Sequence, residues 1–317
     1  LGISLNVFLL FLIWKFSPVE HKRYRILLSF NVCSSMLVTI SLLPNYLVLD
    51  ICDGNYIVHQ FNLLKYTDNF FIHRISFTFF IFALFSCIFS SSSMFIFRYF
   101  QICTTKKIQI IDIQLMFFIG MVCAFVIAGL FYFVMSHDYR NDGDMLLYVL
   151  KNGIATEDTI NKIFLLMFII KTYKNPFFLT CLLTITIFFG ANYTIILFCI
   201  FKVNKYLESH SSNYDKVTKR LHSELTRLMI IQLLLPFIFT SGQMLFCIVS
   251  MIFELKTTGV GIIDMIMISF LPSVNAFCFL INSKSYWANM FKIKNKKIVV
   301  TRSKTQNRNF KVAVTRI

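Results

Sequence analysis

The residues of this sequence that could pair with or bind charged groups stand at the edges of long apolar stretches. Arg98 and Tyr99 directly follow the apolar residues 75–97. An arginine in that position can reach across the floor of a helical bundle, or it can serve only to anchor the chain at a membrane surface. Asp264 is the one acidic residue inside an apolar stretch. Its carboxylate could contact a ligand, pair with Arg74, or be solvated at an interface.

Four basic residues precede the apolar stretch 228–253. They share one face if a helix over this stretch begins early enough to include them. The second, third and fourth lie 3, 4 and 11 residues after the first, which is helical spacing; they are Lys216, Lys219, Arg220 and Arg227. The face they form is either a protein-binding surface or a solvated face near anionic lipid.

Two prolines interrupt apolar stretches near the C-terminal end. Pro236 lies within 228–253 and Pro272 lies within 262–281. Proline removes a backbone hydrogen bond, so such helices kink and the freed carbonyls need partners. Each kink is either a hinge or a static bend. Gln243 is a candidate for the same ligand pocket as Asp264, or for a hydrogen bond between helices.

Patterns for catalysis or cofactor binding do not accompany these residues. The sequence contains no His-rich metal cluster, no Gly-x-Ser-x-Gly and no buried acid pair. Its nine cysteines show no metal-ligand spacing. We therefore predict that the protein is not an enzyme and has no metal or cofactor site.

The composition indicates a membrane protein. Of the 317 residues, 57% are hydrophobic, 17% aromatic and only 15% charged, whereas soluble domains have about 25% charged residues. A soluble globule of this length could not hide so much apolar surface. The formal net charge of +16 therefore poses a question of membrane orientation and does not indicate nucleic acid.

A helix needs about 20 mostly apolar residues to cross the hydrocarbon layer. Seven stretches qualify, with approximate bounds 1–16, 26–49, 75–97, 113–135, 176–203, 228–253 and 262–281. They predict an all-α membrane protein with a seven-transmembrane helix bundle over residues 1–281. Residues 282–317 are expected to form a basic cytoplasmic tail with a short amphipathic helix. The chain does not start with Met, so a few residues before the first span are expected to be missing.

Two apolar segments leave alternatives open. The eight residues 163–170 are too short to span a bilayer, and we interpret them as a loop segment that packs on the bundle or dips into the interface; an eighth span is the alternative. The first stretch could be a secretory signal, but no basic stretch precedes it and no small-residue cleavage site follows it. We interpret it as a span.

The distribution of Lys and Arg predicts the orientation. The loops after spans one, three and five, together with the tail, carry 23 of the 31 basic residues. Basic residues concentrate on the cytoplasmic side of membrane proteins. We therefore expect the tail in the cytoplasm and, with seven spans, the N-terminus outside.

Three motifs within this arrangement resemble one family. They are Phe97-Arg98-Tyr99-Phe100 after span three, the entry to span six from Thr218-Lys219-Arg220 to Leu235-Pro236, and Leu271-Pro272-Ser273-Val274-Asn275 in span seven. Together they resemble the nematode chemoreceptors, the serpentine seven-transmembrane receptor families. Class r (Str) is most similar, followed by classes d, h, i and j. The resemblance covers nearly the whole chain, and the entry to span six is its most specific part.

The resemblance implies a G-protein-coupled receptor for an odorant or pheromone. A small ligand would bind between the outer helix halves, with Asp264, Arg74 and Gln243 as candidate contacts. Arg98, Tyr99 and the four basic residues before span six would couple to a heterotrimeric G protein, and Pro236 and Pro272 would act as hinges. The expected location is the plasma membrane, in a sensory cilium.

The sequence also departs from receptors of the rhodopsin type. Phe97 stands before Arg98 where those receptors carry an acid, so the usual restraint on the arginine is missing. Trp-x-Pro in span six and Asn-Pro-x-x-Tyr in span seven are absent. A transporter or channel for a small solute is the alternative function, but that class usually shows repeats or several intramembrane charges.

Overall fold

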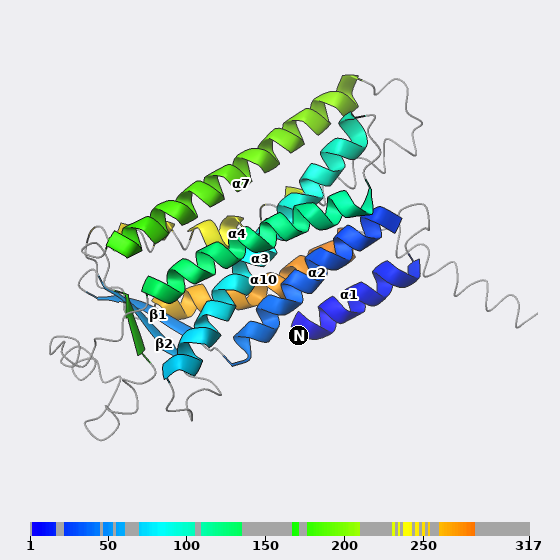
Figure 1. The fold of residues 1–317 in the computed structure, drawn as a ribbon. Coiled ribbons are helices and arrows are strands. Elements are labelled where there is room, and N and C mark those ends of the chain that lie inside the picture. The colour runs from blue at the N-terminus through cyan, green and yellow to red at the C-terminus, as the bar shows by residue number, and fades with distance from the viewer. Residues whose placement is uncertain are drawn as a thin grey trace, which may run out of the picture.

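The computed structural model describes a bundle of long helices with a small sheet at one end (Figure 1). The described residues are 2–16, 22–44, 47–52, 55–60, 70–104, 109–134, 167–170, 176–209, short parts of 230–253, and 260–282. The long helices are α1 (Gly2–Phe16), α2 (Lys22–Leu42), α3 (Phe70–Cys103), α4 (Ile110–Val134), α7 (Pro176–Ser209) and α10 (Val260–Asn282).

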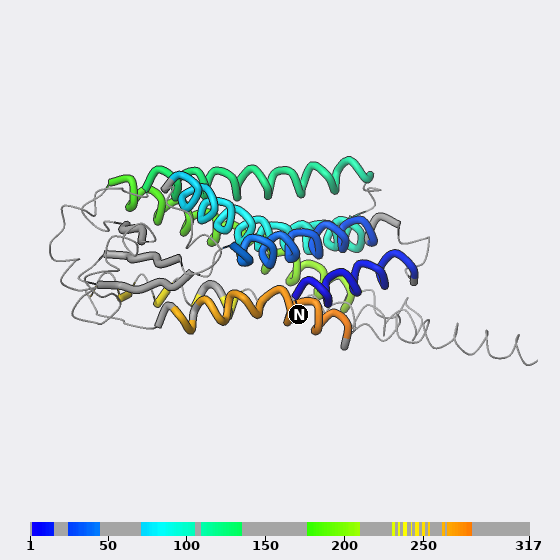
Figure 2. Tube along the Cα trace, turned by 90° about the horizontal axis from the view of Figure 1, so that it is seen from below, coloured from blue at the N-terminus to red at the C-terminus, as the bar shows by residue number. Residues whose placement is uncertain are grey.

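The two ends of the bundle differ, and we name them by what they carry. The sheet end carries the three strands, and α3 and α10 both begin there. At the opposite end, which we call the tail end, α3 ends at Cys103 and α10 ends at Asn282. Figure 2 shows α4 on one side of the bundle and α10 with α1 on the other, with α2 and α3 between them.

Helix α3 is the central element. It packs against α2, α4 and α7, and 83% of its membrane-length stretch is buried inside the bundle, against 22% for α4 and for α7. Among the described residues, α2, α3, α4 and α7 are long and apolar enough to cross a membrane, and α1 and α10 hold shorter apolar segments. The helices around α3 therefore present their other faces to lipid.

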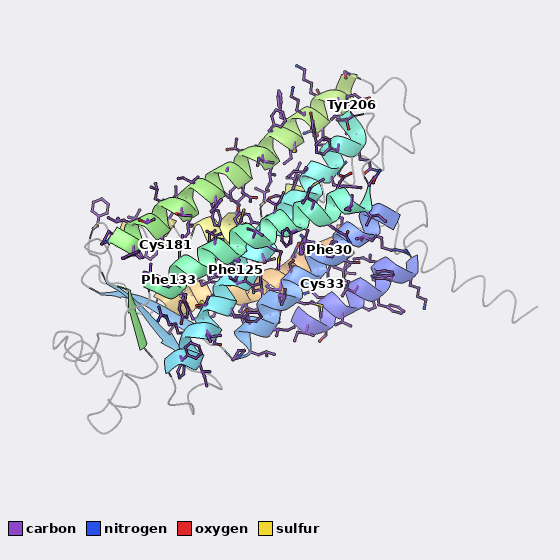
Figure 3. All side chains as sticks on the ribbon, in the orientation of Figure 1. Phe30, Cys33, Phe125, Phe133, Cys181 and Tyr206 are labelled. Atoms are coloured by element: carbon purple, nitrogen blue, oxygen red, sulfur yellow. The ribbon has the colours of Figure 1, made fainter. Side chains whose placement is uncertain are left out.

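The lipid-facing surface of α4 is mostly apolar. Exposed side chains follow one another at three to four residues from Ile111 through Leu115, Phe118 and Val122 to Phe125, and Phe133 is exposed about two turns further on. Figure 3 shows Phe125 and Phe133 on this outer side of the bundle. In water such a surface would be an aggregation site, and in hydrocarbon it costs nothing.

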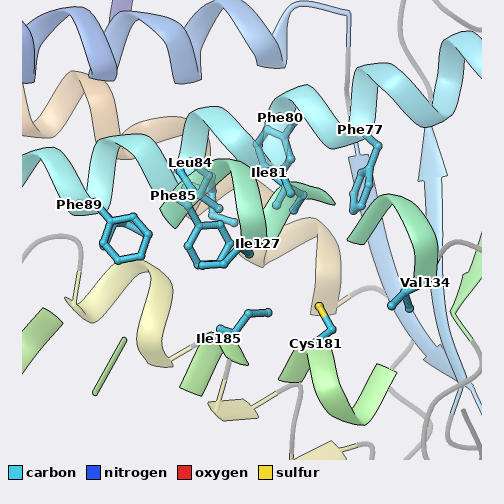
Figure 4. Packing of buried hydrophobic residues seen from close by; sticks show 14 of the residues in the cluster. Phe77, Phe80, Ile81, Leu84, Phe85, Phe89, Ile127, Val134, Cys181 and Ile185 are labelled. Atoms are coloured by element: carbon cyan, nitrogen blue, oxygen red, sulfur yellow. The ribbon is translucent and has the colours of Figure 1, made fainter. Parts of the chain in front are cut away.

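The largest apolar core lies between α3, α4 and α7 (Figure 4). From α3 it takes a row of aromatic and branched side chains, and α4 and α7 contribute Ile127, Val134, Cys181 and Ile185. The Phe85 and Phe89 rings meet Phe189 and Phe188 of α7 edge to face, with centroids 5.6 and 6.3 Å apart. Edge-to-face pairs add to the energy of simple area burial.

The second helix is shorter than the apolar run predicts. We expected span two to reach Leu49, but α2 ends at Leu42, and the Leu43 N–H donates to the Ile40 carbonyl at 3.2 Å. Pro44 explains this end, because a proline disfavours helical geometry in the residue before it and lacks an N–H. The apolar residues after it belong to a strand.

A three-stranded antiparallel sheet joins two loops at the sheet end. Strands β1 (Leu47–Cys52) and β2 (Asn55–Gln60) form a hairpin, and β3 (Met167–Ile170) pairs with β2. Strand β1 also contacts α10. The stretch 163–170, predicted as a loop segment on the bundle, thus contributes β3, and residues 163–166 lie outside the described residues.

Helix α4 approaches α3 closely at a glycine. A Cβ added to Gly120 would lie 3.1 Å from the Phe89 Cβ, whereas one added to Gly129 of the same helix would meet nothing within 4 Å among the described residues. Small residues at such crossings let two helix backbones come together in a membrane.

We expect Gly120→Leu to lower the thermal unfolding midpoint of the detergent-purified protein. Overpacking costs about 1–3 kcal/mol, and replacing a helical glycine returns only about 1 kcal/mol. Gly129→Leu is the matched control and should leave the midpoint unchanged or raise it. Fluorescence-detected size-exclusion chromatography after heating measures both. Equal midpoints for the two variants would contradict close α3–α4 packing at Gly120.

Candidate functional site

The first two predicted site residues lie at the tail end of α3. Arg98 is only 5% exposed, although it stands close to the end of the helix. The Tyr99 ring packs against the Phe198 ring of α7, with 5.9 Å between the ring centroids. A cation that only anchored the chain to lipid headgroups would be exposed. Arg98 instead lies within the floor of the bundle.

A second contact joins α3 to α7 at the same level. The Cys103 thiol donates to the Lys202 carbonyl at 3.7 Å, and the Lys202 ammonium lies 5.6 Å from the centroid of the Phe198 ring. Tyr99 and Cys103 are four residues apart and therefore share a helix face. The tail end of the bundle is thus closed on one side by α3 and α7, with Arg98 beside this seam.

Phe97, which stands where receptors of the rhodopsin type carry an acid, packs in a different direction. It is buried in an apolar cluster with residues of α1, α2 and α10, among them Leu9, Leu28 and Phe279. The floor is therefore held on this side by apolar packing. Lys216, Lys219, Arg220 and Arg227 lie outside the described residues, so their common face stays a prediction.

The two predicted hinges have different surroundings. Pro272 lies inside α10, and Asn6 of α1 donates to its carbonyl at 3.3 Å while also bonding the Gly2 carbonyl at 2.8 Å. Pro236 lies outside the described residues. The residues that follow it in sequence, Phe237–Ser241, form a π-helix labelled η5. Short π segments mark an interruption of the regular hydrogen-bond ladder and occur often at functional sites.

The predicted ligand-pocket residues are described only in part. Arg74, near the sheet end of α3, donates from both Nε and a terminal nitrogen to the Tyr132 carbonyl of α4, with 2.7 Å for Nε. Its guanidinium also lies 3.8 Å from the centroid of the Tyr132 ring. The Asp264 backbone belongs to α10, but its side chain lies outside the described residues, as does Gln243. The structure therefore gives Arg74 a partner on α4 and leaves its pairing with Asp264 a prediction.

Buried polar side chains connect α3 to α2 in the middle of the bundle. The Asn31 amide of α2 donates to the Ser90 and Ser91 hydroxyls at 3.4 and 3.3 Å. One turn further along α2, the Ser35 hydroxyl lies 3.6 Å from the Cys87 sulfur. Ser35 also accepts from the Asn275 amide of α10 at 3.5 Å. This chain of contacts links three helices through polar groups.

The same serine run connects α3 to α7 on its other side. Ser92 donates a hydrogen bond to the Asn192 side-chain carbonyl of α7, and Asn192 is only 6% exposed. Asn192 and Asn275 thus both bond to a neighbouring helix. Sequence analysis did not single out Asn31, Ser35 or Asn6. These residues could have been found from the sequence, because an amide or hydroxyl inside a predicted span is usually bonded to a neighbouring helix.

A metal site does not form in the described part of the chain. No three His, Cys, Asp or Glu side chains there come close enough to hold an ion. The described part of the chain thus offers a buried cation in the floor, polar contacts across α3, and a proline inside α10.

Comparison with known proteins identifies the architecture. Residues 1–290 match the sequence family described as serpentine type 7TM GPCR chemoreceptor Str. A search of curated proteins found no match. Among solved structures, the crystal structure of squid rhodopsin superposes with a TM-score of 0.62 at 13% identity, over 92% of this chain and 80% of that one. The fold is therefore a seven-transmembrane helix bundle, as the sequence predicted, and it is similar to that of squid rhodopsin.

The Ser92–Asn192 bond yields a test of how the helices are held together. In a double-mutant cycle with Ser92→Ala and Asn192→Ala, we expect a coupling free energy of about 0.6 kcal/mol and at most about 1.7 kcal/mol, the range for interhelical bonds in membranes. Unfolding curves in SDS measure it. Thr186→Ala is the control on α7, because the exposed Thr186 hydroxyl donates to the Leu182 carbonyl of its own helix and, among the described residues, to no other helix. Additive effects in the Ser92–Asn192 cycle would contradict the contact.

Proposed function

The chain belongs to the Str family of serpentine seven-transmembrane chemoreceptors, and from this premise we propose that it converts binding of a small odorant or pheromone into activation of a heterotrimeric G protein. The observation that carries the proposal is Arg98, a cation buried in the floor of the bundle at the end of its central helix. A floor that must open to admit a partner protein needs a charged group that is covered in one state and reachable in the other.

The proposed location is the plasma membrane, in a sensory cilium. The proposed orientation puts the tail end in the cytoplasm and the N-terminus outside. The excess of basic residues in the tail and in alternate loops supports it. In this orientation Arg98 and Tyr99 face the side on which a heterotrimeric G protein is found. The four basic residues before span six would meet the same partner.

The proposed ligand site lies between the helix halves at the sheet end. The described core at this end includes Phe77, Phe80 and Phe178, and apolar and aromatic surroundings suit a small apolar ligand. Asp264 and Gln243 would add polar contacts. Arg74 would line the ligand site, with its guanidinium held in place by the Tyr132 carbonyl and ring.

The proposed switch is a movement of the sixth span at its proline. The π-helix Phe237–Ser241 directly follows Pro236 in sequence, and an irregular ladder at that point supports bending there. Span seven is held at its proline, since Asn6 of α1 donates a hydrogen bond to the Pro272 carbonyl. A ligand that prefers the open arrangement shifts the population towards it.

We expect Arg98→Ala to abolish ligand-driven recruitment of the G protein while the protein still reaches the cell surface. Recruitment in cells, screened against volatile and water-soluble small molecules, measures this beside surface labelling. Lys205→Ala is the control and should recruit normally, because it also removes one cation at the tail end, but an exposed one on α7. Normal recruitment by the Arg98 variant would refute the assigned role, and ligand-dependent solute flux without any G protein would favour the transporter alternative.

Pro236→Ala should weaken signalling more than ligand binding. Restoring a regular hydrogen-bond ladder stiffens the sixth span, so we expect the maximal response to fall at unchanged ligand affinity. Pro176→Ala is the matched control, because Pro176 is the first residue of α7, where proline costs a helix little. A full response from the Pro236 variant would make the kink a static bend.

A further inference from the structure

One side-chain cluster at the tail end takes no part in the proposed switch. The Arg25 guanidinium of α2 lies over the Trp14 indole of α1, with 4.7 Å between Cζ and the ring centroid. The indole N–H donates to the Ser29 hydroxyl at 3.1 Å, and that hydroxyl donates to the Arg25 carbonyl at 2.9 Å. These three contacts fix the ring and the guanidinium relative to each other.

The cluster holds a positive charge that its own contacts do not neutralise. An indole ring attracts a cation through its quadrupole but carries no net charge. The Arg25 Nε is buried and has no hydrogen-bond acceptor among the described residues. Placing such a donor without a partner beside a membrane is costly. Arg25 as a whole is only partly buried, so an anion at the membrane surface can approach its guanidinium although the Nε itself is covered.

A second cation lies on the same side of α1. The Lys15 ammonium is 4.7 Å from the centroid of the Phe11 ring. Phe11 and Trp14 are both more than half exposed and three residues apart, so they share one face of α1. Two aromatic rings at one membrane level thus each lie beside a cation. Aromatic and basic residues together are typical of the membrane–water interface.

An apolar strip leads from these cations into the membrane. On α1 the exposed side chains continue from Phe11 to Val7, and on α2 the exposed side chains include Cys33 and Ile40. Cys33 is labelled on α2 in Figure 3. A molecule that fits both features has an anionic head at the membrane surface and apolar chains below it.

We propose that Trp14, Lys15 and Arg25 form a binding site for an anionic phospholipid in the leaflet at the tail end. Its headgroup accepts hydrogen bonds from the Arg25 guanidinium and is attracted to the Lys15 ammonium. Its acyl chains lie along the strip formed by α1 and α2. Zwitterionic phospholipids match the strip but not the charge, and free phosphate matches the charge but not the strip. The proposal requires the membrane-embedded fold and does not depend on the proposed signalling.

The test uses Trp14 as its own reporter. The chain has two tryptophans, so Trp287→Phe in the full-length protein leaves Trp14 as the fluorophore. The protein is placed in phosphatidylcholine nanodiscs with a fixed fraction of lipid brominated in its acyl chains, either phosphatidylserine or phosphatidylcholine. Bromine quenches the indole on contact. We expect brominated phosphatidylserine to occupy the site about fivefold more readily than brominated phosphatidylcholine, the effect of one basic residue near a surface.

Arg25→Gln should remove this preference and leave quenching by brominated phosphatidylcholine intact, which shows that α1 still faces lipid. Lys202→Gln is the matched control and should keep the preference, because Lys202 also lies over an aromatic ring at the tail end but on α7. If Arg25→Gln does not fold, Arg25→Lys is used, and the preference should fall only in part. Equal quenching by the two lipids in the parent protein, or an unchanged preference after Arg25→Gln, would overturn the proposal.

Discussion

The hydrocarbon interior of a bilayer offers no hydrogen bonds, so the polar side chains of a spanning helix must find partners within the protein. Helix α3 supplies hydrogen-bond partners to several of its neighbours. It bonds α2 through Ser90 and Ser91, α7 through Ser92, and α4 through Arg74 near the sheet end. Four successive serines, 90 to 93, can serve neighbours on different sides, because successive helix positions point about 100° apart. The other helices are arranged around this polar axis.

Burial within the bundle follows from that central position and not from hydrophobicity. The membrane-length stretches of α3 and α7 have the same mean hydropathy of 2.0, yet 83% of the first is buried and 22% of the second. Both stretches satisfy the requirement for crossing a bilayer, which is why apolar length alone predicts the spans. Composition does not say which of them faces protein. In α3 the serines and Arg98 are the sequence features that require protein on several sides.

The predicted end of the second span was wrong because a β-hairpin follows Pro44. The residues between β1 and β2 are Asp53 and Gly54, and Asp-Gly between two short strand-forming runs is a strong hairpin signal. The apolar residues Leu47–Leu49 extend the predicted second span to Leu49, whereas Pro44 and the Asp-Gly pair favour a helix end and a turn. The pairing of β3 with β2 could not be predicted, since it joins residues more than 100 positions apart. Arg98 and Tyr99 were recognisable from their position after span three, but the burial of Arg98 depends on the helices around it.

The distribution of polar contacts separates the parts of the bundle that are held from the part that is proposed to move. Helix α3 is bonded on several sides, and α10 is bonded to α1 at the Pro272 carbonyl and to α2 through Asn275. Displacing these helices would break buried hydrogen bonds where no water replaces them. The sixth span contains a π segment directly after its proline, so part of its regular ladder is already interrupted and bending there breaks fewer bonds. In the proposed switch, a change that starts at the sheet end would therefore be transmitted at lowest cost by the sixth span moving against α3. The proposal then requires Arg98 to become reachable while α3 stays in place.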